Sequence, residues 1–269
     1  MNRPGLRDPL VLDGDYVSPN TNPSLIGRLL PSLVFHSRIV GIVRRAFLAA
    51  RKGQFDRSHL MMRSHETLRA LEQLGVRAEV ENTEVLNHLE GPCVIVANHM
   101  STLETFVLPG LVIPFCPMTF VVKKSLTEIP IFGPIMRSCD PIVVGRSNPR
   151  EDLKAVLEGG VDRISRGFTI AVFPQTTRTV HFAPESFSSI GVKLAKRAGV
   201  PVVPLALRSD AWGTGRMVRE FGRFRPALPV RFAFGEAMEV NGTGRAEHGA
   251  TVSFINENLN RWFSEVPPE

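Results

Sequence analysis

The chain has 269 residues, of which 43% are hydrophobic and 22% are charged, so it can form one sizeable core with an appendage and is not a disordered chain. Lysine and arginine total 32 against 26 acidic residues, which favours an anionic partner such as a membrane surface, a phosphorylated small molecule or nucleic acid. The single tyrosine, with no cluster of aromatic and basic residues that would stack bases, argues against nucleic acid.

Cysteine content and hydropathy give further expectations about the compartment. Cys93, Cys116 and Cys139 are odd in number and match no zinc spacing, which is typical of free thiols in a reducing compartment. Residues 1–23 contain no long apolar run, and no stretch reaches the roughly 18 apolar residues of a membrane span. We therefore expect neither a secretory signal nor an integral membrane protein.

The segment 24–52 differs from the rest of the chain. It holds six basic residues, and no acid occurs between Asp15 and Asp56, while leucine and valine are interleaved with the arginines. This pattern predicts a basic amphipathic helix that lies flat among anionic lipid headgroups, with Pro31 in a first helical turn. The alternative is an ordinary helix packed on the domain with solvated arginines. The expected organisation is a tail and membrane-proximal helix over 1–57 and a main domain over 58–269.

From residue 58 onward, amphipathic helical patterns alternate with short apolar runs. Strands are predicted at 76–80, 92–97, 118–122, 141–144, 168–173, 200–207 and 229–236, and helices at 58–75, 153–164, 190–198 and 252–262. Buried strands separated by helices predict an α/β fold with a largely parallel mixed sheet flanked by helices. Ligands of such sheets bind beyond the carboxyl ends of the strands. The loops of interest are therefore NHMSTLE, KKSLTEIPIFG, GRSNPR, PQTTRT and RSDAWGTG.

The first of these loops carries a histidine and an acid. His99 follows the strand 92–97 directly, and Glu104 stands five residues later. An imidazole can take a proton from a hydroxyl, and a carboxylate can fix its tautomer. The two side chains meet only if His99 precedes a helix and Glu104 lies in its first turn, because five helical steps point them apart. The alternative for Ser101-x-x-Glu104 is a helix-capping box, which is compatible with the catalytic role.

Three further loops add basic side chains at the same predicted edge. Lys123, Arg146 and Arg178 each follow a predicted strand. Arginine suits bidentate binding of a phosphate, although each of these residues alone could be a solvated surface charge. Together with His99 they predict a site for an anionic substrate that contains a general base.

At this point the residues resemble the glycerolipid acyltransferases, the 1-acylglycerol-3-phosphate acyltransferase group. NHMSTLE resembles the first motif of that family, usually Asn-His, four residues, then Asp. KKSLTEIPIFGPIMRSCDPIVVGR is similar to the second region, FPQTTRT to the third motif (usually Phe-Pro-Glu-Gly-Thr-Arg-Ser) and VPVVPLAL to the fourth. The four motifs follow the family's order over residues 91–210, and the ordered set is highly specific.

The resemblance implies an acyltransferase domain over 58–269 and a role for each matching residue. His99 would deprotonate the acceptor hydroxyl and Glu104 would orient His99. The acceptor's phosphate would contact Lys123, Arg146 and Arg178, and the substrate loops would contribute Asn98, Ser101, Gln175, Thr176 and Thr177. The strand with Pro201 and Pro204 would shape the acyl pocket, and Gly133 would allow the turn of the second region. Acyl-CoA or acyl carrier protein would be the donor, with no metal and no cofactor.

The implied reaction moves a fatty acyl group to the free hydroxyl of a lysophospholipid, 1-acylglycerol-3-phosphate first, in phospholipid synthesis at the cytoplasmic face of the membrane. Three departures bear on this expectation: Glu104 for Asp, Gln175 for Glu and Thr176 for Gly. The last two put the acceptor's identity in question more than the reaction. A different acceptor such as a lyso-ornithine lipid, a catalytically silent lipid-binding protein, and a thioesterase that uses His99 and water remain as alternatives.

Overall fold

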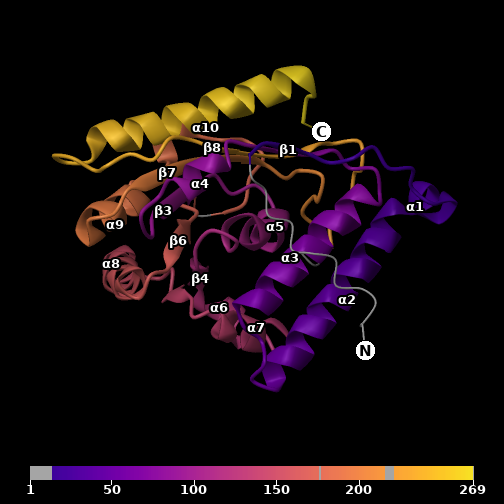
Figure 1. Cartoon of the computed structure of the whole chain (residues 1–269), viewed down its shortest axis with the longest axis horizontal. Helices are drawn as coiled ribbons and strands as arrows, with labels where there is room; N and C mark the ends of the chain where they lie inside the picture. Colours follow the sequence, from indigo (N-terminus) through magenta and orange to yellow (C-terminus); the bar gives the residue numbers. More distant parts are fainter. Residues whose placement is uncertain (1–13, 176, 216–220, 269) are drawn as a thin grey trace.

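The computed structural model describes residues 14–175, 177–215 and 221–268. An eight-stranded sheet runs through it in the order β1-β2-β8-β7-β3-β6-β4-β5 (Figure 1). The strands are β1 (Tyr16–Val17), β2 (Ala78–Glu81), β3 (Val94–Ala97), β4 (Met118–Lys123), β5 (Ile142–Val144), β6 (Thr169–Val172), β7 (Val202–Arg208) and β8 (Val230–Phe234). Every strand predicted from the sequence is present, and β1 is additional.

Five neighbouring strands, β7, β3, β6, β4 and β5, run parallel to one another. β8 is antiparallel to β7, β2 is parallel to β8, and β1 is antiparallel to β2. The residues of β3, β6 and β7 are buried throughout because helices cover both faces of this part of the sheet. The predicted largely parallel mixed sheet flanked by helices is confirmed.

The helices cover the sheet in layers. They are α1 (Leu25–Leu29), α2 (Pro31–Arg51), α3 (Arg57–Glu72), α4 (Glu84–Asn87), α5 (Leu103–Val112), α6 (Lys124–Glu128), α7 (Phe132–Ser138), α8 (Pro149–Ser165), α9 (Ile190–Ala198) and α10 (Arg245–Glu265), with a 3-10 turn at Pro184–Ser186. Figure 1 shows α10 along one side of the sheet and α5, α3 and α2 on the other. α9 ends at Gly199, whose left-handed φ of 67° confirms the predicted stop.

The predicted single helix over 24–52 is divided in the structure. α1 ends before Leu30, and Pro31 opens α2, where the missing N–H of proline costs no helical hydrogen bond. One face of α2 enters the core: Phe35 is fully buried and stacks on Phe224 with ring centroids 4.0 Å apart. None of the described helices is long and apolar enough to cross a membrane.

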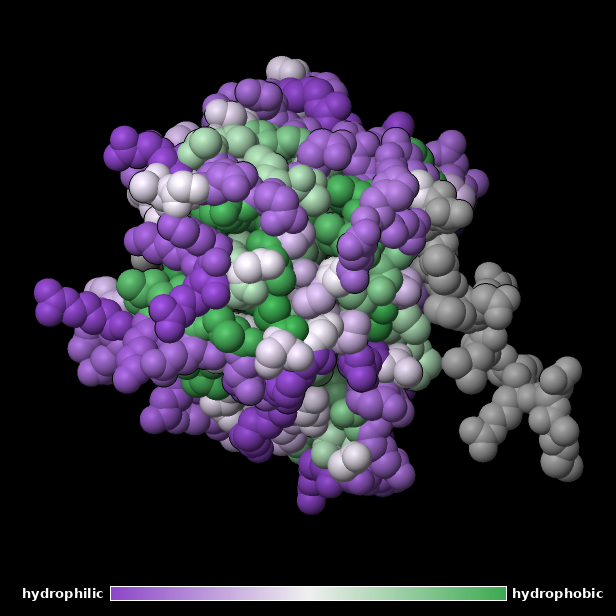
Figure 2. Space-filling view, turned by 60° about the vertical axis from the view of Figure 1, so that its left-hand side comes forward, coloured by the Kyte–Doolittle hydropathy of each residue, from purple (hydrophilic) through white to green (hydrophobic). Residues whose placement is uncertain are grey.

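A second set of apolar side chains, on α1, on α2 and at Leu30 between them, faces outward. We call it the outer apolar surface; its members are more than 40% exposed and are Leu25, Ile26, Leu29, Leu30, Leu33, Val40 and Leu48. α2 therefore has one apolar face packed inside the protein and another in contact with solvent. Seen from another side, the molecule also has a hydrophobic area framed by hydrophilic residues (Figure 2).

α3 fixes the position of α5, which follows the predicted catalytic loop. Pro109 interrupts the hydrogen bonds of α5, and side chains of α3 bond its backbone there. Ser64 Oγ donates to Val107 O at 2.6 Å and accepts from Gly110 N at 2.7 Å, while His65 Nε2 donates to Gly110 O at 3.0 Å. A Cβ at Gly110 would lie 2.7 Å from the His65 ring, so this close approach requires glycine.

Candidate active site

The histidine loop, residues 98–102, leaves the carboxyl end of β3 and leads into α5. Its first residue fastens it to the neighbouring strand: Asn98 Nδ2 donates to Leu207 O at 2.8 Å, and Leu207 N donates to Asn98 Oδ1 at 2.9 Å. Asn98 is only 2% exposed, so its side chain acts as an extension of the sheet. This geometry gives Asn98 an internal role in holding the loop against β7.

His99 and Glu104 meet in the way that the sequence spacing required. His99 precedes α5, Glu104 lies in its first turn, and His99 Nδ1 is 2.8 Å from Glu104 Oε1. The His99 ring stacks on Phe173 with centroids 4.6 Å apart. Among the described residues, no hydrogen-bond partner engages the second ring nitrogen, Nε2. The side chain of His99 is 16% exposed, so this nitrogen is the one available to a substrate.

Glu104 is fully buried, yet many donors surround it. Oε1 also accepts from Met100 N at 2.8 Å and Ser101 N at 2.9 Å, and Oε2 accepts from the hydroxyls of Ser101 and Ser209. Burial acts to raise the pKa of Glu104, but the hydrogen bonds and the charge of His99 outweigh it and the pKa is lowered. An ionised Glu104 holds the proton of His99 on Nδ1, which leaves Nε2 as a proton acceptor.

The loop after β6 clamps the backbone of His99 from both sides. His99 N donates to Gln175 Oε1 at 2.6 Å, and Thr179 N donates to His99 O at 2.9 Å. The guanidinium of Arg178 donates to the hydroxyl of Thr102. Thr177 is exposed, and Thr176 lies outside the described residues. The third-motif loop therefore lies beside His99 and also holds the backbone of His99 in position.

The predicted basic residues stand at the carboxyl ends of adjacent parallel strands. In the sheet order β3-β6-β4-β5, the edge carries His99, then Arg178, then Lys123, then Arg146. Lys123 and Arg146 are exposed. Arg146 has a left-handed φ of 59°, and its backbone N–H donates to Asp152 Oδ1 at 3.2 Å. The structure therefore brings these residues to one edge, while their contact with a phosphate stays a prediction.

The remaining predicted residues have more internal surroundings. Ser101 is 3% exposed and bonds Glu104. Pro204 is buried within β7 opposite Val96, and Pro201 O accepts from Val94 N at 3.0 Å. Gly133 lies inside α7 without a positive φ; a Cβ there would lie 2.4 Å from the carbonyl oxygen of Thr127. Close backbone approach, rather than a turn, explains this glycine.

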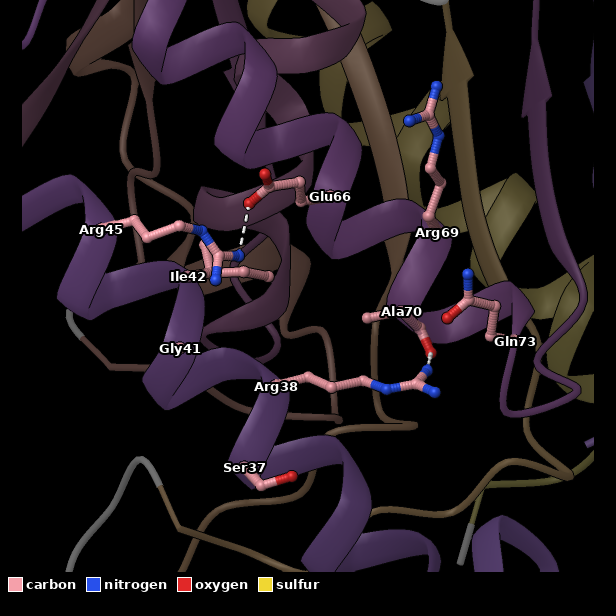
Figure 3. A pocket seen from close by; sticks show the side chains of 9 residues that line it. All are labelled: Ser37, Arg38, Gly41, Ile42, Arg45, Glu66, Arg69, Ala70 and Gln73. Carbon is pink, nitrogen blue, oxygen red and sulfur yellow. Dashed lines mark hydrogen bonds and ion pairs between the residues drawn. The ribbon is translucent and has the colours of Figure 1, made fainter. Parts of the chain in front are cut away.

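A hollow of about 420 Å³ lies between α2 and α3, and it contains none of the predicted site residues (Figure 3). Arg45 Nη2 donates to Glu66 Oε2 at 2.8 Å across this space, and Arg38 Nη1 donates to Ala70 O at 3.3 Å. Arg63 also bonds Glu66, at 2.7 Å. Two of the six basic residues in the segment 24–52 are thus turned toward α3.

Sequence reasoning assigned no role to Ser209, Thr102, Phe173 or Thr179, although all four lie in loops or motifs that it singled out. Each stands in or directly beside a loop that follows a strand, which is the signal that was available. Serine and threonine are common in loops, so residue type alone does not distinguish Ser209, Thr102 and Thr179.

Comparison with known proteins decides the family. A model of the family described as Acyltransferase matches residues 77–208. The 1-acyl-sn-glycerol-3-phosphate acyltransferase of Pseudomonas aeruginosa is 32% identical over 195 residues, which are 72% of this chain and 70% of that protein. The chain belongs to the acyltransferase family. The enzyme of that name from Saccharomyces cerevisiae is 30% identical over 141 residues, or 51% of this chain and 45% of the yeast protein.

A solved structure supports the fold of this acyltransferase. The 1-acyl-sn-glycerophosphate (LPA) acyltransferase PlsC of Thermotoga maritima superposes with a TM-score of 0.61, covering 91% of this chain and 98% of that one. Its sequence is 21% identical, so the likeness concerns the fold. The predicted family, fold class and reaction class are all confirmed.

Proposed function

We propose that this acyltransferase moves a fatty acyl group from acyl-CoA or acyl carrier protein to the free hydroxyl of 1-acylglycerol-3-phosphate. The observation that carries the proposal is the His99–Glu104 pair, whose open Nε2 stands at a sheet edge lined by Arg178, Lys123 and Arg146. Curated relatives that bear this activity in their names add support. Acyl transfer to a phosphorylated acceptor needs both a base and cationic groups, and this edge supplies both.

In the proposed mechanism, His99 Nε2 takes the hydroxyl proton while the acceptor oxygen attacks the thioester carbonyl. The ionised Glu104 stabilises the imidazolium that forms. Collapse of the tetrahedral intermediate breaks the carbon–sulfur bond, and the imidazolium returns the proton to the departing thiolate. A thioester is already activated, so positioning and a base suffice without a covalent enzyme intermediate. Arg178, Lys123 and Arg146 would hold the acceptor's phosphate.

The experiment is thiol release from palmitoyl-CoA or palmitoyl-acyl carrier protein with an acceptor panel: lysophosphatidic acid, lysophosphatidylcholine, a lyso-ornithine lipid, or no acceptor. We expect release that depends on lysophosphatidic acid, together with the matching diacyl product. Release without acceptor would indicate a thioesterase. Stronger stimulation by another lysolipid would reassign the acceptor, and no release with either donor would leave a silent lipid-binding protein.

We also propose that the enzyme works as a peripheral protein on an anionic membrane surface, through the outer apolar surface of α1 and α2. Leu33 is 64% exposed and Val40 51% exposed on the same helix as Arg44 and Arg51. Leu126, Ile129 and Ile131 of the α6–α7 region are also exposed, and α7 packs beside α2. Apolar side chains mixed with basic ones are typical of helices that lie in the headgroup layer.

A further inference from the structure

Ser209 follows β7 directly, and its hydroxyl reaches the acid of the catalytic pair from 105 positions away in the chain. Ser209 Oγ donates to Glu104 Oε2 at 2.5 Å, and Ser101 Oγ lies 2.9 Å from Ser209 Oγ. Ser209 is fully buried, so no substrate can touch it. Any influence of this serine on the reaction must therefore pass through Glu104.

Contacts of the surrounding backbone place the Ser209 hydroxyl beside Glu104. Asn98 fixes the end of β7 beside the histidine loop through its two hydrogen bonds with Leu207, two residues before Ser209. Ser209 N then donates to the sulfur of Met100 at 3.3 Å. The histidine loop and the end of β7 thus hold each other, and the serine is placed by the same contacts that place His99.

The two carboxylate oxygens of Glu104 have different hydrogen-bond partners, and Ser209 bonds only Oε2. Oε1 accepts from His99 Nδ1 and two backbone N–H groups, whereas Oε2 accepts from the hydroxyls of Ser101 and Ser209 and, at 3.1 Å, from Ser101 N. A glutamate has one more rotatable bond than the aspartate that usually stands at this position of the first motif. Its carboxylate therefore needs an additional fixed partner to keep Oε1 directed at His99.

We propose that Ser209 is a positioning residue for the His99–Glu104 pair, and that its role is coupled to the presence of glutamate rather than aspartate at position 104. An aspartate is one methylene shorter, so its carboxylate could not bond His99 and reach the end of β7 together. The Ser209 hydroxyl would then lose its hydrogen bond to the carboxylate at position 104. This proposal rests on the acyl transfer proposed above.

The test is a double-mutant cycle of Ser209→Ala and Glu104→Asp, measured as kcat and KM with palmitoyl-CoA and lysophosphatidic acid. A hydrogen bond to a carboxylate predicts that Ser209→Ala lowers kcat on the order of 10-fold, with KM for both substrates within about 2-fold. In the Glu104→Asp background, the same substitution should lower kcat by less than about 2-fold. Ser209→Cys, which is slightly larger than serine but keeps a weak donor, should recover part of the loss.

Ser18→Ala is the matched control, because Ser18 is also buried and its hydroxyl accepts from Ala78 N at 2.9 Å, far from the pair. It should lower thermal stability about as much as Ser209→Ala and leave kcat unchanged. Equal kcat losses from Ser209→Ala in both backgrounds, or an unchanged kcat, would overturn the role of Ser209 while the transfer reaction stands. A wild-type enzyme without acceptor-dependent transfer would instead reject the proposed function, and this inference with it.

Discussion

The histidine loop buries polar side chains, whereas the outer apolar surface of α1 and α2 exposes apolar ones. In the histidine loop, the polar groups of Asn98, Ser101 and Glu104 are bonded inside the protein and buried to 3% exposure or less. On the outer surface, Leu33 and Val40 face solvent although apolar side chains usually gain free energy by burial. The first region is built for fixed geometry, whereas the second has the properties of a surface whose counterpart lies outside the chain.

This contrast predicts that the two regions can be impaired separately, and His99→Ala gives the largest effect. Loss of a general base lowers the rate about 10²–10⁴-fold, while binding to vesicles should not change because His99 lies in the sheet-edge site. The measurements are kcat/KM with lysophosphatidic acid and sedimentation with anionic vesicles. A folded variant with activity within a few-fold of wild type would refute the mechanism.

The converse experiment replaces apolar residues on the outer surface. Leu33→Asp combined with Val40→Asp should weaken binding to anionic vesicles at least about 10-fold, because two apolar side chains no longer enter the headgroup layer. Turnover of a short-chain, water-soluble acceptor should be retained. The control is Ser253→Asp with Asn260→Asp, which adds the same charge to exposed positions of α10.

The control should bind vesicles nearly as well as wild type, with both proteins binding less in high salt. Equal loss in the two double variants would assign the effect to net charge alone. These substitutions are a sharper test than deleting residues 1–52, because that deletion would also remove the fully buried Phe35 from the core.

The sequence predicts the sheet well because the physical signal of its strands is strong. Runs such as those at 94–97 and 170–172 are apolar throughout, as expected for strands covered on both faces, and parallel strands must end at a common edge. Helical geometry gave only the condition for a meeting of His99 and Glu104, namely that His99 precedes a helix and Glu104 lies in its first turn, and the structure fulfils this condition. α5 itself was not predicted in full, because it is short and contains Pro109.

Other features depend on contacts that sequence spacing does not reveal. Phe35, Ile39, Ile42 and Ala46 of α2 have helical spacing and are buried, but apolar residues also occur on its other faces, so the pattern did not show which face packs inside. The bond between Ser209 and Glu104 joins positions 105 residues apart. Such a contact arises only when β7 and the histidine loop are placed side by side.

The smallest expected effect concerns Gln175. This residue bonds the histidine loop, yet it stands where the third motif of the family usually has a glutamate. Its Oε1 accepts from His99 N at 2.6 Å, which agrees with a loop-shaping role through a bond to backbone. A glutamate carboxylate could accept the same hydrogen bond, so the loop should keep its shape in Gln175→Glu. What changes is the charge beside His99 and near Arg178.

We therefore expect Gln175→Glu to keep kcat within a few-fold and to raise the apparent KM for lysophosphatidic acid roughly 3- to 10-fold, since an added negative charge repels a phosphate at this partly screened site. The KM for the zwitterionic lysophosphatidylcholine should change less. Gln175→Met is the matched control: it keeps the length but removes the acceptor for His99 N–H, so kcat should fall equally on both acceptors. Steady-state kinetics on the two acceptors separates these outcomes. If Gln175→Glu gives an unchanged preference or the same uniform loss as Gln175→Met, residue 175 acts only by holding the histidine loop, and its lack of charge has no part in selecting an anionic acceptor.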